Sequence, residues 1–408
     1  MNVPKLRFKE FTDVWKEYPL KYFTTPIKRK NINNESDLPL TISSLDGLVD
    51  QRTYFNKVVA SKDMSNYYLL KKGEFAYNKS YSVGFPFGSI KRLDKYNQGA
   101  LSSLYICFQV NNMNSDFIVK YFESPQWHKQ ISLCVAEGAR NHGLLNVNIN
   151  DFFSTKHFLP QLAEQEKIAN FLAIVDKKIT NLENIITSLE NQKKGLLQQI
   201  FSQKLRFKDK NGNNYPNWEK KKLGKLLSIT SSKRVHEADW TTSGIPFYRA
   251  RDIVSIFNNK PISKIYISEK LYEECSSSCG KISENDLLVT GVGTIGIPYL
   301  VKKSDKFYFK DGNIIWLKNS PAIYGKYLFY IFISSYVQKQ INMMTGKGTV
   351  GTYTIKNAKD TNILLSCLEE QTKIANFLSA FDRKLENQKA QLEHWKQIKK
   401  GLLQQMFV

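Results

Sequence analysis

The strongest constraint on the fold of this chain is a 36-residue stretch that occurs twice. It covers residues 164–199 and recurs without a gap at residues 370–405, and 18 of the 36 positions are identical. The offset of 206 residues is far too long for a solenoid, in which units of roughly 20–50 residues stack on one another. We therefore infer that a whole unit, a globular block followed by this stretch, has been duplicated.

Each copy predicts a long amphipathic helix. Apolar residues recur at alternating steps of four and three, which is the a/d pattern of a coiled coil. These seam residues are Ile168, Leu172, Val175, Ile179, Leu182, Ile186 and Leu189 in the first copy, and Ile374, Leu378, Phe381, Leu385, Leu392 and Trp395 in the second. Lysine interrupts both seams at equivalent positions, Lys193 and Lys399, where we expect a partner subunit to touch the helices.

The duplication extends to the two blocks that precede the helices. The LRFK sequence at Leu6–Lys9 recurs at Leu205–Lys208, and Trp15 recurs as Trp218. Both blocks are rich in aromatic and β-branched residues with closely spaced turn residues, which predicts short strands with a few helices. We expect domains at 13–160 and 216–365 and long helices at 161–203 and 366–408.

The seam also predicts how the two helices pair. A stripe of two apolar residues per heptad needs a partner helix, and the other copy is the simplest one. Parallel pairing would require a long connection back along the helix, so antiparallel pairing is favoured. The predicted fold class is α+β, with two twisted β-rich domains joined by an antiparallel coiled coil of pseudo-two-fold symmetry. Roughly 40 residues per helix would give a rod of about 60 Å.

The charge of the chain is concentrated outside the helices. The formal net charge is +22, whereas residues 161–203 carry 0 and residues 366–408 carry +2, so the remaining blocks hold +20. Basic blocks of this kind favour a polyanionic partner. Five cysteines without paired spacing suit a reducing cytosol. Neither a secretory signal nor an 18-residue apolar run is evident, so we expect a cytoplasmic protein with no membrane span.

Motifs for catalysis are weak. Residues Gly291–Gly296 fit G-x-G-x-x-G, but Pro298 and a strand-like run follow where a dinucleotide site requires a helix, so we expect a turn between strands. The Asp/Asn-Pro-Pro-Tyr/Phe tetrapeptide that amino-methyltransferases use is absent, and the five histidines are scattered. The chain is therefore expected to catalyse nothing by itself.

Polar, basic and aromatic segments of the blocks remain as candidates for binding DNA. Lys and Arg neutralise phosphates, and Arg, Asn, Ser and Thr also read base edges in the major groove. The candidates are Lys28, Arg29, Lys30, Ser43, Ser44, Arg52, Lys79, Arg140 and Asn141 in block one, and Lys233, Arg234, Arg249, Arg251, Thr294, Lys347 and Thr349 in block two. No metal-binding residues are predicted.

The duplicated helices also carry a family resemblance. E-Q-x-x-I-A-x-x-L occurs at Glu164–Leu172 and Glu370–Leu378, and K-x-G-L-L-Q at Lys193–Gln198 and Lys399–Gln404. With two dissimilar blocks, this pattern resembles the specificity subunit of type I restriction–modification enzymes. The resemblance implies a non-catalytic subunit that binds double-stranded DNA through two target recognition domains. It also implies two modification subunits that use S-adenosylmethionine and two restriction subunits that use ATP and Mg²⁺.

Two domains of one fold with different surfaces predict recognition of a bipartite, asymmetric DNA site, one half-site per domain, with an unread spacer set by the helices. Two alternatives stay open on the sequence. One is a self-sufficient DNA methyltransferase. The other is a basic coiled-coil scaffold that binds DNA without sequence specificity.

Overall fold

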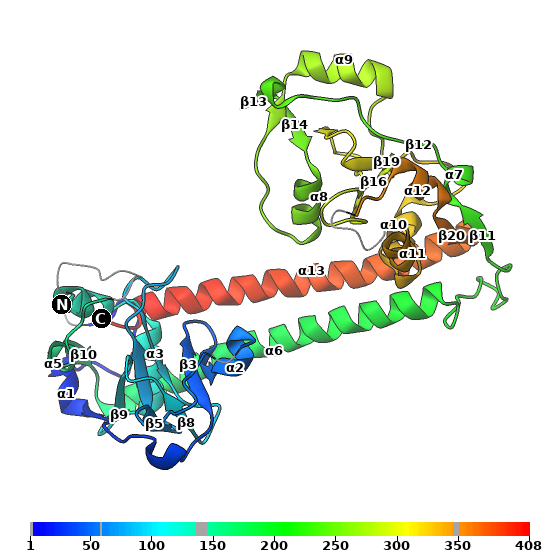
Figure 1. The fold of residues 1–408 in the computed structure, drawn as a ribbon. Helices are drawn as coiled ribbons and strands as arrows, with labels where there is room; N and C mark the ends of the chain where they lie inside the picture. Colours follow the sequence, from blue (N-terminus) through cyan, green and yellow to red (C-terminus); the bar gives the residue numbers. More distant parts are fainter. Residues whose placement is uncertain (1–2, 58, 136–144, 346–350) are drawn as a thin grey trace. The chain divides into compact units, whose positions relative to one another are not determined.

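The computed structural model describes residues 3–57, 59–135, 145–345 and 351–408. The chain divides into two compact units. Unit 1 is Met1–Glu183 with Ala390–Val408, and unit 2 is Asn184–Lys389. The two long helices, α6 (Leu162–Phe201) and α13 (Leu368–Gln405), therefore each contribute one segment to each unit (Figure 1).

The short strands of unit 1 form two sheets and one separate strand pair. The sheets have the orders β2-β9-β6-β7 and β4-β3-β8-β5, and β1 pairs with β10. The strands are β1 (Lys16–Pro19), β2 (Thr24–Pro26), β3 (Pro39–Ser43), β4 (Gly47–Asp50), β5 (Tyr68–Lys71), β6 (Phe75–Asn78), β7 (Ser89–Arg92), β8 (Gln98–Leu101), β9 (Ile106–Val110) and β10 (Lys156–Leu159). The helices are α1 (Leu20–Phe23), η1 (Ile32–Asn34), α2 (Gln51–Phe55), α3 (Ser115–Glu123), α4 (His128–Cys134) and α5 (Ile149–Ser154).

Unit 2 has the same arrangement with different elements inserted. Its sheets have the orders β12-β19-β16-β17 and β13-β15-β14-β18, and β11 pairs with β20. The strands are β11 (Glu219–Lys222), β12 (Ile229–Thr230), β13 (Trp240–Thr241), β14 (Ile245–Tyr248), β15 (Tyr266–Ile267), β16 (Leu287–Thr290), β17 (Pro298–Leu300), β18 (Tyr308–Phe309), β19 (Ile314–Leu317) and β20 (Asn362–Leu365). The helices are α7 (Leu223–Leu226), η2 (Glu237–Asp239), α8 (Ala250–Phe257), α9 (Glu269–Cys279), α10 (Gly325–Ile333), α11 (Ser335–Thr345) and α12 (Ile355–Asp360).

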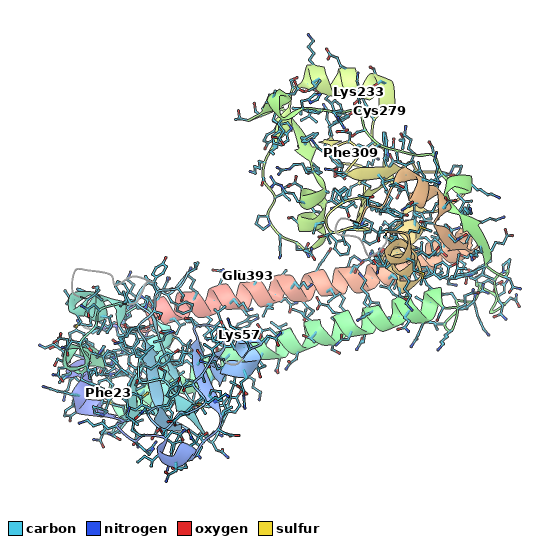
Figure 2. All side chains as sticks on the ribbon, in the orientation of Figure 1. Phe23, Lys57, Lys233, Cys279, Phe309 and Glu393 are labelled. Atoms are coloured by element: carbon cyan, nitrogen blue, oxygen red, sulfur yellow. The ribbon has the colours of Figure 1, made fainter. Side chains whose placement is uncertain are left out.

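The strands form because their side chains are buried on one or both faces. All four residues of β16 are buried, as are all five of β3, and such continuously buried runs are typical of strands covered on both sides. Each unit closes around aromatic side chains such as Phe23 in unit 1 and Phe309 in unit 2, which lie among their neighbours in Figure 2. The predicted α+β class with two β-rich domains and two long helices is confirmed.

Within unit 1, the end of α13 lies antiparallel to the beginning of α6. Lys396 pairs with Glu183 at 2.8 Å, and further along Lys399 pairs with Asp176 at 2.7 Å. Beyond the helix, Phe407 enters the core and packs against Phe117, with ring centroids 5.4 Å apart. The predicted antiparallel pairing of the two helices is therefore observed in this unit.

Unit 2 repeats these contacts with the two helices exchanged. Lys389 pairs with Glu190 at 2.6 Å, and Lys193 pairs with Asp382. Phe201, the last residue of α6, packs against Tyr327 with ring centroids 5.7 Å apart. In each unit the segments of the two long helices therefore pair antiparallel, as the duplicated sequence predicts.

The N-terminal LRFK sequences clamp the start of each long helix. In unit 1, Arg7 donates two hydrogen bonds of 2.8 Å to the buried carboxylate of Glu164. In unit 2, Arg206 donates to Glu370 at 3.1 and 2.8 Å. Because a bidentate arginine–carboxylate pair fixes both distance and direction, these clamps set how each helix enters its domain.

The lysines that interrupt the seam have partners within the chain, and contact of a partner subunit with the helices at these positions stays a prediction. Lys399 lies between Glu123 at 2.9 Å and Asp176 at 2.7 Å, and Lys193 pairs with Asp382, which also accepts from the Tyr330 hydroxyl at 2.5 Å. The apolar seam is therefore interrupted because each of these lysines forms partly buried ion pairs with carboxylates of its own unit.

Candidate functional site

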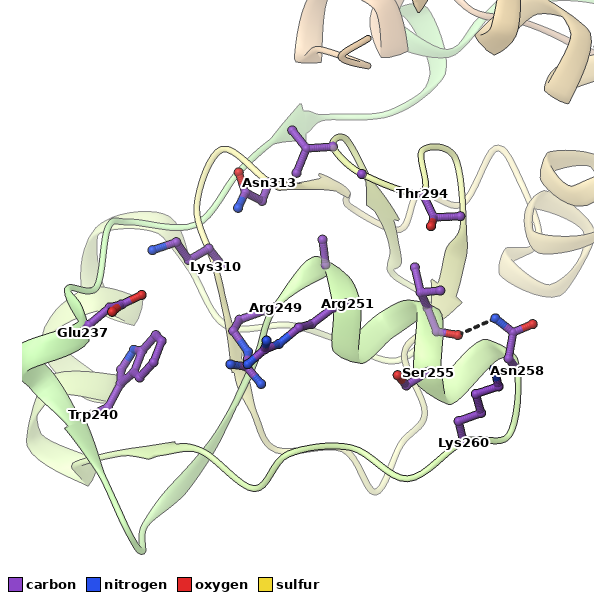
Figure 3. Close-up of a pocket in the computed structure, with 14 residues that line it drawn as sticks. Glu237, Trp240, Arg249, Arg251, Ser255, Asn258, Lys260, Thr294, Lys310 and Asn313 are labelled. Atoms are coloured by element: carbon purple, nitrogen blue, oxygen red, sulfur yellow. Dashed lines mark hydrogen bonds between the residues drawn. The ribbon is translucent and has the colours of Figure 1, made fainter. Parts of the chain in front are cut away.

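A cleft lined by polar and cationic side chains lies within unit 2. It has a volume of about 890 Å³ and is lined by α8, by the turn between β16 and β17, and by the segments around Trp240 and Lys310. Figure 3 shows Arg249 and Arg251 at one end of α8 and Asn258 and Lys260 at the other. Arg249, Arg251, Lys260 and Lys310 give its lining four cationic side chains against the single carboxylate of Glu237.

The two arginines at the start of α8 have different surroundings. The Arg249 guanidinium donates to Asp252 at 2.8 and 3.1 Å and lies over the Trp240 ring, 5.7 Å from its centroid. The Arg249 amide also donates to Asp252, at 2.9 Å, so this carboxylate caps the helix. Arg251 is exposed and makes no hydrogen bond or ion pair with any described residue. Its donors are therefore available to a ligand.

The glycine motif at Gly291–Gly296 forms a tight turn between the antiparallel strands β16 and β17, as predicted. Thr290 holds the turn, because its hydroxyl donates to the Thr294 carbonyl at 2.6 Å and accepts from the Ile297 amide at 3.0 Å. At Gly296, φ is +77° and a Cβ would lie 3.1 Å from Ile341, so glycine is required. The turn leaves the Thr294 side chain exposed beside the cleft.

Most predicted arginines and serines of unit 1 are engaged by its own polar groups. Arg29 donates to Glu74 at 2.9 and 2.7 Å, and Arg52 donates to Asp50 at 2.9 Å. Ser43 donates to Asp46 at 2.7 Å. Ser44 lies 3.2 Å from both Ser82 and Ser89, beside a smaller cavity of about 440 Å³.

The remaining predicted residues are distributed more widely. Lys28 is exposed, Lys30 is half-buried over the Tyr68 ring, and Lys79 is half-buried. In unit 2, Lys233 is exposed, and Arg234 pairs with Asp311 at 2.9 Å. Of all the predicted residues, the unit 2 cleft brings together Arg249, Arg251 and Thr294. Arg140, Asn141, Lys347 and Thr349 lie outside the described residues.

Sequence reasoning missed five polar residues that line the same cleft. Ser255 comes from α8 and Asn258 directly follows its last residue, while Lys260, Lys310 and Asn313 come from connecting segments. The spacing of Arg251, Ser255 and Asn258 at steps of four and three could have indicated one polar face of a helix. Lys260 and Lys310 belong to no motif, and only the fold brings them to the cleft.

The predicted seam residues lie on the inner side of the long helices. Ile168, Leu172, Val175, Leu182, Ile186, Leu189, Ile374, Leu378 and Leu385 are buried, and Ile179, Phe381, Leu392 and Trp395 are half-buried. Residues at the helix starts, such as Leu172 and Leu378, pack into the domain cores. Across the described part of the chain, no helix is both long and apolar enough to cross a membrane.

Comparison with known proteins gives a consistent set of relatives. The family model described as the type I restriction modification DNA specificity domain matches residues 215–394. A putative type I restriction enzyme specificity subunit of Haemophilus influenzae is 29% identical over 162 residues, which are 39% of this chain and 39% of that protein. The type I restriction enzyme MjaVIII specificity subunit of Methanocaldococcus jannaschii is 24% identical over 325 residues, which are 75% of this chain and 73% of that protein.

Solved structures share the fold over nearly the full length. The S subunit of a type I restriction–modification system from M. genitalium aligns with a TM-score of 0.56 at 16% identity and covers 100% of this chain and 99% of its own. A chain from a study of complex assembly in the type I R-M system aligns with a TM-score of 0.58 at 15% identity, covering 95% and 96%. The family match over residues 215–394, the relatives and the shared fold thus agree in their similarity to specificity subunits of type I restriction–modification systems.

Proposed function

We propose that this chain is the DNA sequence-specificity subunit of a type I restriction–modification complex. Each unit binds one half of a bipartite, asymmetric DNA site, and the chain itself carries out no chemistry. The observation that supports this most directly is that the two units share one frame but expose different surfaces. Unit 2 has the cation-lined cleft at α8, whereas the equivalent part of unit 1 carries the five-residue α2, whose Arg52 is held by Asp50.

The paired helices are proposed to space the two half-sites and to dock the other subunits. Unlike the two blocks, they are nearly neutral, so they are better suited to protein contacts than to contact with DNA. Exposed apolar side chains on α6, Ile174 and Ile185, are available for such contacts. We propose two modification subunits that use S-adenosylmethionine and two restriction subunits that use ATP and Mg²⁺, in the cytoplasm, with no cofactor in this chain.

The test is to reconstitute the full chain with its modification subunits and map the methylated adenines by sequencing. We expect one bipartite motif with a fixed spacer. Exchanging residues 13–160 for the equivalent block of a relative should change one half of the motif and leave the other half and the spacer intact. A change in both halves would contradict the assignment of one half-site to each unit.

Two further measurements separate the alternatives. Saturable binding of S-adenosylmethionine by this chain alone would favour a self-sufficient methyltransferase. Equal affinity for all duplexes at matched salt would favour a scaffold without specificity, because phosphate contacts are blind to sequence. Replacing Leu182 and Ile186 with Asp should disrupt the helix pair and weaken bipartite binding, and unchanged binding would argue against the spacer role.

A further inference from the structure

We propose that one face of α8 reads the base edges of the half-site bound by unit 2, and that Arg251 selects a guanine there. This proposal rests on the proposed function, since it assumes that unit 2 binds a DNA half-site. It goes further by assigning the reading element, the base and the separate tasks of the cations around the cleft.

The first argument is the geometry of α8. Arg251, Ser255 and Asn258 are spaced at i, i+4 and i+7, which places them on one face of a helix, and all three line the cleft. At about 1.5 Å per residue they span about 10 Å, roughly three base steps of 3.4 Å. The three side chains have the chemistry of base readers, because arginine pairs with guanine, asparagine with adenine, and serine with several bases.

The second argument is the contrast between the two neighbouring arginines. Arg249 is committed to Asp252 and to the Trp240 ring, so it positions the start of α8 and has little freedom to meet a base. Arg251 lies two residues on, exposed, and without a hydrogen-bond or ion-pair partner in the described chain. A free, planar guanidinium can donate two parallel hydrogen bonds to O6 and N7 of guanine, a pattern that other base pairs do not offer.

The third argument concerns the fixed amide of Asn258. Its nitrogen donates to the Val254 carbonyl at 2.8 Å, drawn as the dashed line in Figure 3. This bond uses one amide hydrogen and fixes the amide, so the side-chain oxygen and the second amide hydrogen are available to a ligand. An acceptor held in this way suits the exocyclic amino group of adenine or cytosine. Asn258 therefore favours a base different from the one that Arg251 selects.

The remaining cations suit phosphate contacts. Lys260 is exposed and Lys310 half-buried, and neither ammonium group has a hydrogen-bond or ion-pair partner among the residues described. Both come from connecting segments that follow α8 in the sequence, outside the polar face of the helix. Flexible lysines neutralise phosphates without distinguishing bases, so they would contribute affinity and salt dependence but not selectivity.

The experiment uses the full chain assembled with its modification subunits and a pool of duplexes in which every position of the half-site is varied. We expect Arg251→Ala to lower discrimination by about 5- to 150-fold at a single position, at which the wild type prefers guanine. Lys310→Gln should weaken binding to all sequences equally, and should reduce the slope of log affinity against log salt by about 1. Lys326→Gln, at an exposed lysine outside the cleft, is the matched control and should change neither quantity.

Arg251→Lys keeps the experiment decisive if the alanine variant folds poorly. It retains the charge but loses the planar pair of donors, so guanine selection should relax while the salt slope stays unchanged. The proposal would be overturned if Arg251→Ala weakened binding to all sequences equally, or if Arg251→Lys reduced the slope of log affinity against log salt. Relaxed discrimination at a position where the wild type does not prefer guanine would also overturn it. These results would leave the proposed function intact, because the wild type would still discriminate between sequences. Failure of the proposed function itself would appear as a wild-type complex without any sequence preference.

Discussion

The two units hold the same helix start with different strength. In unit 2, the fully buried carboxylate of Glu370 accepts from Arg206 at 3.1 and 2.8 Å and from the Trp218 indole at 2.7 Å. In unit 1, Glu164 accepts from Arg7, and the buried indole nitrogen of Trp15 has no hydrogen-bond partner among the described residues. The duplicated tryptophan is present in both units, but in the described structure its indole donates a hydrogen bond only in unit 2.

This comparison shows which parts of the duplicated unit can diverge. The clamp is retained because it is buried, where loss of one partner leaves an uncompensated charge. The surfaces differ because exposed loops tolerate change. The loop between β6 and β7 runs from Lys79 to Gly88, whereas the one between β16 and β17 runs from Gly291 to Ile297. A common frame can therefore carry two different recognition surfaces.

The largest expected effect comes from removing the clamp carboxylates. Glu370→Ala should destabilise unit 2 by about 3–5 kcal/mol, because it strands the Arg206 guanidinium and the Trp218 indole. Glu164→Ala should cost unit 1 about 1 kcal/mol less, since no indole hydrogen bond is lost there. Hydrogen exchange of the full chain, followed by mass spectrometry of peptides from each unit, measures both effects.

The control for the clamp variants is Glu166→Ala, two residues from Glu164 and exposed, which should change stability by less than about 0.5 kcal/mol. Equal losses in the two clamp variants would mean that the Trp218 hydrogen bond contributes nothing. Losses as small as that of the control would mean that the clamps do not hold the helices.

Much of this frame could be predicted from sequence, because the duplication and the heptad pattern are local, repeated signals. The turn at Gly291–Gly296 was also predictable, since Pro298 and a strand-like run excluded the alternative. The positions at which a longer helical segment breaks into two helices could not be predicted in the same way. Residues 124–127 separate α3 from α4, and Ser334 separates α10 from α11. The hydroxyls of Ser124 and Ser334 each donate to the preceding turn.

The availability of each arginine could not be predicted in most cases, because its partner is distant in sequence. Arg29 meets Glu74, and Arg234 meets Asp311, only once the strands are in place. Arg249 with Asp252 is the exception, since a carboxylate three residues after a helix start is a local capping signal. Sequence composition therefore located the basic blocks, but the fold decides which cations face a ligand.

A second, smaller effect should distinguish the units: unit 1 should lose stability at acid pH because it contains the buried His157. His157 is buried in unit 1, with Nδ1 2.8 Å from the Tyr121 hydroxyl and Nε2 2.8 Å from that of Thr155. Burial lowers the pKa of His157 to about 3. The unit 2 position equivalent to it in the β11–β20 pair is Ile363. An acid-sensitive group is thus present at this position in one unit only.

The direction of this pH dependence follows from the lowered pKa. The unfolded chain binds a proton below about pH 6.5, whereas folded unit 1 does not, so stability falls as the pH drops from about 6.5 towards 3. At pH 4.5 the loss is roughly 2–3 kcal/mol relative to pH 7. Protection factors, corrected for intrinsic exchange rates, should show this in unit 1, and His157→Ile should abolish it. A loss that persists in His157→Ile would assign the acid sensitivity to other groups.

The smallest expected difference concerns the lysines that interrupt the seam. Lys399→Met leaves Glu123 and Asp176 short of one partner each and should cost about 2 kcal/mol, whereas Lys193→Met affects Asp382 and should cost about 1 kcal/mol. Methionine is used in both because it fills a similar volume and continues the apolar seam. Urea unfolding of the two full-length variants measures the difference, and a larger cost for Lys193→Met would reverse the comparison.

Unfolding at acid pH is a second test of the Lys399→Met prediction. Burial raises the pKa of Asp176, but hydrogen bonds from Lys120 and Lys399 outweigh it and leave the pKa below its ordinary value. A carboxylate with a lowered pKa stabilises the folded chain above about pH 4, and this contribution is lost as the pH falls through the lowered value. Wild type and Lys399→Met should therefore differ at pH 7 and converge once the pH falls below the lowered pKa of Asp176. A difference that persisted there would mean that Lys399 stabilises unit 1 through packing of its aliphatic stem and not through the carboxylates.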